Sequence, residues 1–594
     1  MWNTNKKQKI AKTPNESKAS YGAGCKKVME IKICQNCKTE FVIEKEDFLF
    51  YKKIKVPPPT FCPDCRLQRR LVWMVNINLF KRKCNLCEKE VISMYNPKIP
   101  FKIYCHKCWW SDKWDARDYG KGYDFSKPFF EQWKELLQQT PILGLSIDTI
   151  TGELSPYTNH CGQAKHCYMI FYSDYNEDCL YGFYLTQNKS LIDCSVTLES
   201  EFCYDNINSF KNYHVFGSSG NVTQSLDCAF LRDCDNCQYC FGSANLKSQK
   251  YVFFNKQYSK EEYFKKISEI DLGSYKKYQE IKNKTLNHFL EYIPRPNYDD
   301  FSENCTGSYI FQSKNCKKCF NIVGCKDSKY LMMIKLVKVS NSHDYTDWGE
   351  NAEQIYESMT VGSNIENVYF SHECGYGLNN IEYSKLSTGA SNHFGCVSMK
   401  KIDYCILNKQ YSKEEYEKLV PKIKQHMMDM PYVDKNGRVY KYGEFFPMEF
   451  SPHAYNNSFA NLFFPKTKKE VEKDGLVWYE ADVKEYPITI LASQLPDNIK
   501  NTTDKILREI IGCSTCPRGY KIIKLELDLS KKLNVPLSRQ CPFCRIGDKV
   551  NKWVSQMKQV DRICDKCGID FKTHYTKEKA SKIYCKSCYN KEVY

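Results

Sequence analysis

The spacing of apolar residues predicts two kinds of structure along the chain. Between residues 155 and 411, apolar and small side chains recur at short intervals with few helix signals, which is typical of short stacked β-strands. Around residue 130 the apolar residues follow helical spacing instead. This predicted helix begins near Ser126 and Pro128, and its apolar stripe consists of Phe129, Phe130, Trp133, Leu136 and Leu137.

The central region repeats itself. The segment 255–263 recurs identically at 408–416, and a third, more divergent copy of the preceding sequence covers 320–335. Short repeated units of this kind indicate β-solenoid-like coils, which we place at about 155–258 and 300–411. Each array is followed by a predicted helix that opens with a capping box, formed by Ser259 with Glu262 and by Ser412 with Glu415.

Eight Cys-x-x-Cys pairs lie at the two ends of the chain. They are Cys34/Cys37, Cys62/Cys65, Cys84/Cys87, Cys105/Cys108, Cys513/Cys516, Cys541/Cys544, Cys564/Cys567 and Cys585/Cys588. Two such pairs complete a tetrahedral shell of four thiolates, and inner spacings of 24 and 17 residues at each end suit one zinc ion per two pairs. We therefore expect about four zinc ions, which are structural because a closed thiolate shell leaves no position for water. Iron also accepts four thiolates, and crossed pairing would use the same cysteines.

The two ends are copies of one module. Cys34 and Cys513 differ by 479 positions, and Cys105 and Cys585 differ by 480. The first half of each copy resembles the zinc-ribbon family, a treble-clef-like group of bacterial domains, over about 40 residues. The resemblance rests on Cys34-x-x-Cys37, Phe41, the segment 46–53, and Cys62-Pro63-Asp64-Cys65-Arg66 followed by Arg69-Arg70. It implies four zinc ligands and no catalytic residue; the C-terminal copy departs from it at Asp548, which stands where the N-terminal copy has Arg69. The arrangement of the whole chain resembles Cys-rich bacterial proteins.

The charge distribution favours a polyanionic partner. The formal net charge is +17, with +13 in residues 1–140, +10 in residues 510–594 and −6 between them. The ends stay basic after each four-thiolate zinc site is counted as −2. If a helix follows the second Cys-x-x-Cys pair of each module, one face of that helix carries Arg66, Arg69 and Arg70 in the first copy. In the other copy the same face carries Arg545 and Lys549. These faces could contact phosphates, although a solvated helix face is the slightly favoured interpretation.

Sixteen central cysteines allow two interpretations. They are buried packing residues, or clusters such as Cys234-x-x-Cys237-x-x-Cys240 hold a metal or an iron–sulfur cluster. In one repeat Cys237 aligns with another cysteine, but in a second repeat it aligns with Ala390. Positions that exchange cysteine with alanine behave as packing positions, so we favour packing.

Two groups of polar residues at the start of the first array are candidate sites. His160 and His166 each precede a cysteine and would suit a metal, although a loop without metal is the favoured interpretation. The acidic patch of Asp174, Glu177 and Asp178 could do acid–base chemistry, although we expect a solvated turn.

The chain is therefore predicted to be multi-domain and mainly β (α+β), with duplicated two-zinc ribbon modules flanking β-solenoid-like Cys-rich repeats. The predicted domains are a flexible N-terminus (1–24), a first zinc module (25–115), a helical connector (116–154), array 1 with its helix (155–299), array 2 with its helix (300–428), a Cys-free linker domain (429–510) and a second zinc module (511–594).

The composition bounds the function. No apolar run approaches the ~18 residues of a membrane span, and the start carries no secretory signal, so we expect a cytoplasmic protein with no membrane contact. An odd total of 33 cysteines indicates thiols and metal rather than disulfides. The favoured function is a non-catalytic zinc protein whose basic terminal modules contact nucleic acid or a ribonucleoprotein. The alternatives are a protein-interaction scaffold and a metal or iron–sulfur enzyme with its site in the central repeats, although no phosphate loop, nucleophile elbow or zinc-protease helix is present.

Overall fold

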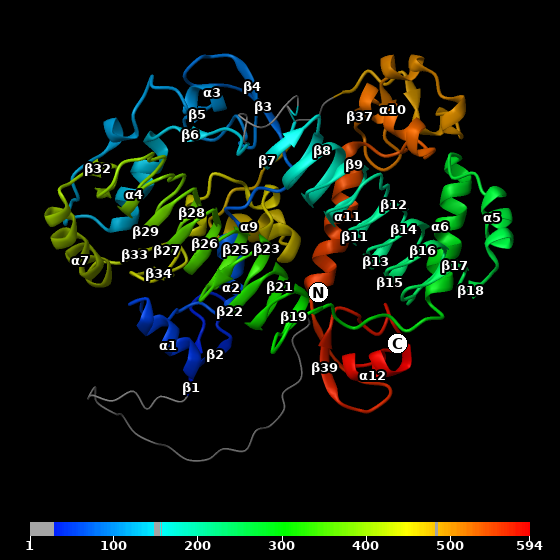
Figure 1. Ribbon diagram of the computed structural model, residues 1–594. Helices are drawn as coiled ribbons and strands as arrows, with labels where there is room; N and C mark the ends of the chain where they lie inside the picture. The colour runs from blue at the N-terminus through cyan, green and yellow to red at the C-terminus, as the bar shows by residue number, and fades with distance from the viewer. Residues whose placement is uncertain (1–28, 148–154, 156, 482–484, 594) are drawn as a thin grey trace.

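The computed structural model describes residues 29–147, 155, 157–481 and 485–593. The expected flexible segment, residues 1–24, lies outside the described residues. Two β-solenoid arrays form the centre of the molecule, and a Cys-rich module lies at each end of the chain (Figure 1). The mainly β solenoid architecture that the sequence predicted is confirmed.

The first array is a stack of parallel coils. Ser195 pairs with Phe183 in one neighbouring coil and with Ile207 in the other, so positions 183, 195 and 207 are equivalent in successive coils. The strands are β7 (Asn159–Lys165), β8 (Tyr168–Thr186), β9 (Lys189–Ile192), β10 (Ser195–Leu198), β11 (Ile207–Phe210), β12 (Tyr213–Phe216), β13 (Ser219–Thr223), β14 (Leu226–Ala229), β15 (Arg232–Asp235), β16 (Gln238–Phe241), β17 (Lys250–Phe253) and β18 (Lys256–Gln257).

The second array repeats this construction with slightly longer coils. Ile365 pairs with Ala352 and with Leu378, so each of these coils is one residue longer than those around Ser195. The strands are β19 (Gly307–Phe311), β20 (Lys314–Lys317), β21 (Cys319–Val323), β22 (Cys325–Lys329), β23 (Met332–Leu336), β24 (Val339–Ser340), β25 (His343–Gly349), β26 (Ala352–Gly362), β27 (Ile365–Tyr369), β28 (His372–Gly375), β29 (Leu378–Glu382), β30 (Ser391–Phe394), β31 (Cys405–Ile406) and β32 (Lys409–Gln410).

A three-residue period underlies both arrays. In the first coil, His160, Gln163 and His166 each have a left-handed backbone with φ near +50°, and the residue that follows each one is turned into the coil. Left-handed conformations are unfavourable for residues other than glycine. Hydrogen bonds between coils offset this cost, as when the left-handed Gln187 donates its N–H to the carbonyl of Asp174 at 3.0 Å. The sequence predicted strands but not this alternation.

The inward positions form columns along each array. One column of the first array contains Cys167, Cys179, Leu191, Cys203, Val215, Cys228, Cys240 and Val252, all buried. Cysteine, leucine and valine therefore occupy equivalent places in this column, as the packing interpretation of the central cysteines expects. Burial raises the pKa of the Cys203 thiol to about 12, so this thiol is neutral and unreactive.

Helices cover the arrays and connect them. They are α1 (Lys45–Lys53), α2 (Pro63–Leu71), α3 (His106–Trp109), α4 (Phe129–Gln139), α5 (Lys260–Ser268), α6 (Tyr275–Phe289), α7 (Lys413–Asp429), α8 (Ala460–Phe463), α9 (Lys468–Lys473), α10 (Lys524–Leu533), α11 (Pro542–Met557) and α12 (Lys586–Val593). Both predicted capping boxes are present, at the starts of α5 and α7. None of the helices in the described part of the chain combines the length and the apolar character needed to cross a membrane.

Short sheets complete the fold outside the arrays. Their strands are β1 (Met29–Ile33), β2 (Glu40–Glu44), β3 (Phe80–Lys83), β4 (Glu90–Ser93), β5 (Ile103–Tyr104), β6 (Ile142–Leu143), β33 (Tyr432–Val433), β34 (Val439–Tyr440), β35 (Ile490–Leu491), β36 (Ile511–Gly512), β37 (Gly519–Tyr520), β38 (Val560–Ile563) and β39 (Asp570–Thr573).

Each terminal module docks on the array that is farther from it in the sequence. Helix α2 of the N-terminal module packs against β25 and β26 of the second array, whereas α11 of the C-terminal module packs against β8 and β10 of the first array (Figure 1). Trp73 and Trp553 are equivalent in the duplication, and both are fully buried at these contacts. The Trp553 ring lies 5.2 Å from the ring of Phe183, and the Trp73 ring lies 5.8 Å from that of His372. The first and last parts of the chain thus each pack on one of the two arrays.

Candidate metal centres and the cavity between the arrays

The sixteen terminal cysteines come together as four groups of four. The groups are Cys34, Cys37, Cys62 and Cys65; Cys84, Cys87, Cys105 and Cys108; Cys513, Cys516, Cys541 and Cys544; and Cys564, Cys567, Cys585 and Cys588. In each group the four sulfur atoms lie within 4.8 Å of one another. Each group therefore combines two Cys-x-x-Cys pairs that are consecutive in the sequence, so the crossed pairing is not the one found.

All four groups are built in the same way. A β-hairpin carries the first cysteine pair at its turn: β1–β2, β3–β4, β36–β37 and β38–β39 respectively. The second pair lies where a helix begins, and Cys62, Cys105 and Cys541 are the N-cap residues of α2, α3 and α11. In the fourth group Cys585 immediately precedes α12. One half of each shell therefore comes from a hairpin turn and the other half from the start of a helix.

The spacing of the sulfur atoms fits a tetrahedral ion. Four thiolates at a zinc–sulfur distance of about 2.3 Å form a tetrahedron with edges of about 3.8 Å. One sulfur–sulfur distance across each group is 3.7 Å for Cys37 and Cys62, 4.0 Å for Cys87 and Cys105, 3.7 Å for Cys516 and Cys541, and 3.8 Å for Cys567 and Cys585. Both the donor set and its dimensions therefore suit zinc.

Backbone N–H groups prepare the thiols to bind metal. The N–H of the third cysteine of each group donates to the sulfur of the first, at 3.1 to 3.3 Å in all four groups. Although burial acts in the opposite direction, backbone hydrogen bonds lower the pKa of Cys84 to about 7 and that of Cys564 to about 6. The Thr515 side chain, together with backbone hydrogen bonds, lowers the pKa of Cys513 to about 6. A thiol with a lowered pKa releases its proton readily to a metal ion.

The basic residues of α2 that were candidates for phosphate contacts lie in buried ion pairs instead. Arg66, Arg69 and Arg70 are only 2%, 1% and 1% exposed. They pair with carboxylates that are also buried: Arg66 with Asp344 at 2.8 Å, Arg69 with Glu357 at 2.7 Å and with Glu444 at 2.8 Å, and Arg70 with Asp344 at 3.2 Å. The prediction that these arginines form an exposed face is wrong, because this face of α2 is the one that docks on the second array.

The C-terminal copy shows the same arrangement. Arg545 forms two hydrogen bonds to Asp193 of the first array, at 2.7 and 2.8 Å, and a third to Glu526 at 2.7 Å. Lys549 lies 2.5 Å from a carboxylate oxygen of Asp205. Arg545 is buried and Lys549 is largely buried, so this pair does not form an exposed phosphate-binding face either. Arg66 and Arg545, equivalent in the duplication, each join a Cys-rich module to the array that is farther from it in the sequence.

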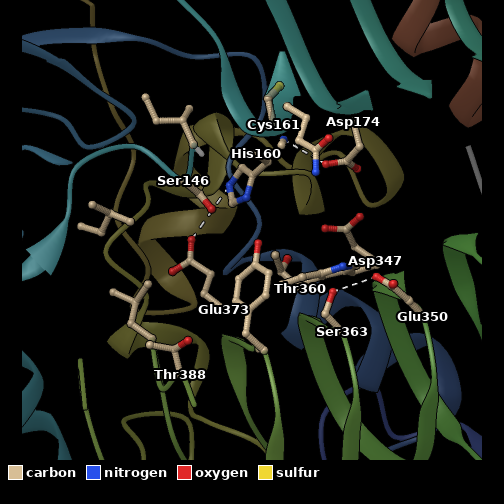
Figure 2. A pocket seen from close by; sticks show the side chains of 18 of the residues that line it. Ser146, His160, Cys161, Asp174, Asp347, Glu350, Thr360, Ser363, Glu373 and Thr388 are labelled. Carbon is tan, nitrogen blue, oxygen red and sulfur yellow. Dashed lines mark hydrogen bonds and ion pairs between the residues drawn. The ribbon is translucent and has the colours of Figure 1, made fainter. Parts of the chain in front are cut away.

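A cavity of about 670 Å³ lies between the two arrays, beneath α3 of the N-terminal Cys-rich module. Its polar residues come from both arrays: His160 on β7, Asp174 on β8, Lys335 on β23, Asp347 on β25 and Glu373 on β28. Figure 2 shows His160 and Glu373 on one side of the view and Asp174 and Asp347 on the other. The arrays thus bring together ionisable groups that are far apart in the sequence.

The electrostatics of this cavity differ from the sequence expectation. Asp174 does not belong to a merely solvated turn, because one of its carboxylate oxygens lies 2.6 Å from the ammonium of Lys335. Burial raises the pKa of Asp347 to about 6, with a further rise from Asp174 and an opposing effect of Lys335. Burial lowers the pKa of His160 to about 4, so this imidazole is neutral at pH 7. Nε2 of His160 lies 4.0 Å from a carboxylate oxygen of Glu373.

Comparison with known proteins adds no assignment. No family model matches the chain, and no curated protein matches it. A structure of a provisionally assigned acetyltransferase from Desulfovibrio desulfuricans G20 is 10% identical, with 48% of this chain and 86% of that chain covered and a TM-score of 0.09. A UDP-N-acetylglucosamine acyltransferase from Campylobacter jejuni is 7% identical, with 51% and 98% covered and a TM-score of 0.08. Similarities this weak carry no argument about fold or function.

Proposed function

We propose that the protein binds four structural zinc ions and that its two zinc-ribbon-like modules clamp the two solenoid arrays into one body. The observation that carries this proposal is that all four sulfur atoms of each group lie within 4.8 Å of one another, with one sulfur–sulfur distance in each group at 3.7 to 4.0 Å, close to the edge of about 3.8 Å expected around zinc. The hairpin knuckle followed by a helix that carries the second cysteine pair supports kinship with zinc-ribbon domains.

The role of the metal follows from the size of the modules. Each hairpin is only a few residues long and cannot bury enough apolar surface to fold alone, so zinc supplies the missing stability. The zinc sites in turn position α2 and α11, whose buried arginines contact the arrays. Loss of zinc should therefore loosen the contact between modules and arrays. The buried free thiols of the arrays fit a reducing compartment such as the cytoplasm.

Substitution of single cysteines tests this proposal. We expect Cys62→Ser, Cys105→Ser, Cys541→Ser and Cys585→Ser each to lower the zinc content by one ion per chain, as measured by mass spectrometry of the metal in purified protein. Cys305→Ser is the matched control, because Cys305 is a half-buried thiol of the second array outside all four groups. Unchanged zinc content in the four ligand variants would contradict the proposal.

Nucleic-acid binding is a second candidate, favoured by the formal net charge of +17. It would need side chains other than the buried arginines, and Lys52, Lys53 and Lys55, all exposed at and after the end of α1, are available. We expect the triple Lys→Gln variant to weaken binding of a single-stranded oligonucleotide and to reduce the salt dependence of the affinity. Equal affinity and an equal salt slope for the variant would remove this candidate.

A further inference from the structure

The cavity between the arrays has the size and the lining of a ligand site. Its volume of about 670 Å³ falls within the range of small-molecule pockets. Most of the surface that it exposes is apolar, with a few polar side chains converging from both arrays. None of its residues belongs to the four cysteine groups, although α3 of the zinc module covers one side.

An aromatic surface is built into the second array at this cavity. Trp348 has φ near +104°, outside the left-handed range near +55° that the arrays otherwise use, so its backbone is strained. Its indole rests on glycines of the next two coils: a Cβ on Gly362 or on Gly375 would come within 2.5 Å of an indole atom. The ring of Tyr376 lies 5.2 Å from that of Trp348 and meets it edge-on. Two glycines and a strained residue therefore hold an indole against the cavity.

The charge of the lining is negative. Four carboxylates line the cavity, namely Asp174, Asp347, Glu350 and Glu373, whereas Lys335 is the one lysine or arginine among the described lining residues. Lys335 is already engaged, because it pairs with Asp174 and donates to the carbonyl of Tyr172 at 2.8 Å. Glu373 is paired with Lys385. In the described part of the chain, no lysine or arginine nitrogen lies within 4.0 Å of Asp347 or Glu350, which flank Trp348.

A buried polar atom faces the cavity without a partner. The side chain of His160 is only 6% exposed, and its Nδ1 has no hydrogen-bond partner among the described residues. Its Nε2 faces Glu373, so the tautomer that donates from Nε2 leaves Nδ1 as an acceptor. An unpaired buried acceptor is costly unless a ligand with an N–H or O–H donor satisfies it.

We propose that this cavity binds an organic ammonium ion, a protonated amine with an apolar body. The ammonium group would be held by Asp347 and Glu350, and the apolar body would pack on Trp348 and Tyr376. Nδ1 of His160, on the other side of the cavity, would accept from a further N–H or O–H group of the ligand. Phosphates and carboxylates are disfavoured by the negative lining. This site is distinct from the zinc sites and does not depend on nucleic-acid binding.

Three probes of nearly equal shape test the proposal on the full zinc-loaded chain: 2-phenylethylamine, 2-phenylethanol and 3-phenylpropionate, measured by isothermal titration calorimetry at pH 7.5. The amine should bind at least about tenfold more tightly than the alcohol, and the carboxylate should bind most weakly. Equal affinities for the three probes, or tightest binding of the carboxylate, would overturn the proposal. The proposal would also fail if the amine did not bind at about 10 mM, which corresponds to the weakest affinity worth considering.

Variants of the lining residues test whether the amine binds in this cavity. Asp347→Asn should weaken amine binding about tenfold and leave alcohol binding nearly unchanged, whereas Trp348→Leu should weaken both. Glu366→Gln is the matched control, because Glu366 is an exposed carboxylate of the same array. If Asp347→Asn fails to fold, as judged by circular dichroism and zinc content, Glu350→Gln replaces it. An amine affinity that neither carboxylate variant changes would show that the cavity does not hold the ammonium group.

Discussion

Replacement of Arg69 by leucine should destabilise the docking of the N-terminal module on the second array. The guanidinium is 1% exposed and pairs with Glu357 at 2.7 Å and with Glu444 at 2.8 Å, and it lies 4.2 Å from the centre of the Phe61 ring. Leucine would leave both carboxylates buried without this partner. Breaking a buried pair costs about 3 to 5 kcal/mol.

The structure places the expected loss near the lower end of this range. Glu357 keeps Arg66 at 3.2 Å and Arg70 at 3.4 Å, and Glu444 keeps two hydrogen bonds from Thr60. We therefore expect Arg69→Leu to lower the free energy of unfolding by about 3 kcal/mol. Urea unfolding of the zinc-loaded protein, followed by tryptophan fluorescence, measures this because Trp73 is buried at the same interface.

An exposed pair provides the control for this experiment. Arg117 pairs with Asp115, and their side chains are 47% and 39% exposed, so Arg117→Leu should cost less than about 1 kcal/mol. Adding Glu444→Gln to Arg69→Leu should restore part of the loss, because it removes one of the unpaired charges. If Arg69→Leu costs under about 1 kcal/mol and weakens oligonucleotide binding instead, the buried-pair reasoning is refuted and the exposed face expected from the sequence is restored.

Three more outcomes follow from other contacts. Lys549→Met should cost about 1 to 2 kcal/mol in urea unfolding, less than Arg69→Leu, because Asp205 keeps Lys282. Cys203→Ala should cost about 1 kcal/mol and leave the zinc content unchanged, since the thiol only packs in its column. Affinity for 2-phenylethylamine should rise about tenfold from pH 5 to pH 7, because Asp347, with a pKa of about 6, loses its proton in this range and the anion holds the amine; a pH-independent affinity in calorimetry would contradict this. Asp347 also faces Asp174, which is paired with Lys335. Lys335 keeps its charge over this range because its pKa is raised, and the buried tyrosines Tyr172, Tyr184 and Tyr345 stay neutral because their pKa values are also raised.

Short-range patterns in the sequence were enough to predict the architecture. The Cys-x-x-Cys spacing placed the knuckles, because ligands two residues apart converge on one ion whatever the rest of the fold does. The recurrence of 255–263 at 408–416 placed the two arrays, and Ser259 with Glu262 placed the start of α5, because a capping box acts within one helical turn. Exchange of cysteine with alanine among repeats identified packing positions such as Cys237, which is fully buried.

Long-range pairing was not visible in the sequence. Arg66, Arg69 and Arg70 have the same spacing on a helix whether that face meets water or a partner, and their partner Asp344 lies far along the chain in the second array. For the same reason Asp174 could not be matched with Lys335. A pattern that could have pointed to the cavity is the run Gly349, Gly362 and Gly375, in which glycine recurs once per coil next to Trp348.

Metal content is the most direct test of the central claim that four closed zinc sites organise this fold. Protein expressed without added metal should be analysed for all transition metals and by absorbance, and compared with the same protein after chelation. The account predicts about four zinc ions per chain, no visible colour, and weakened docking of the modules after chelation. Fewer than four ions at saturation, iron with visible absorbance, or a chelated protein that unfolds like the metal-loaded one would contradict it.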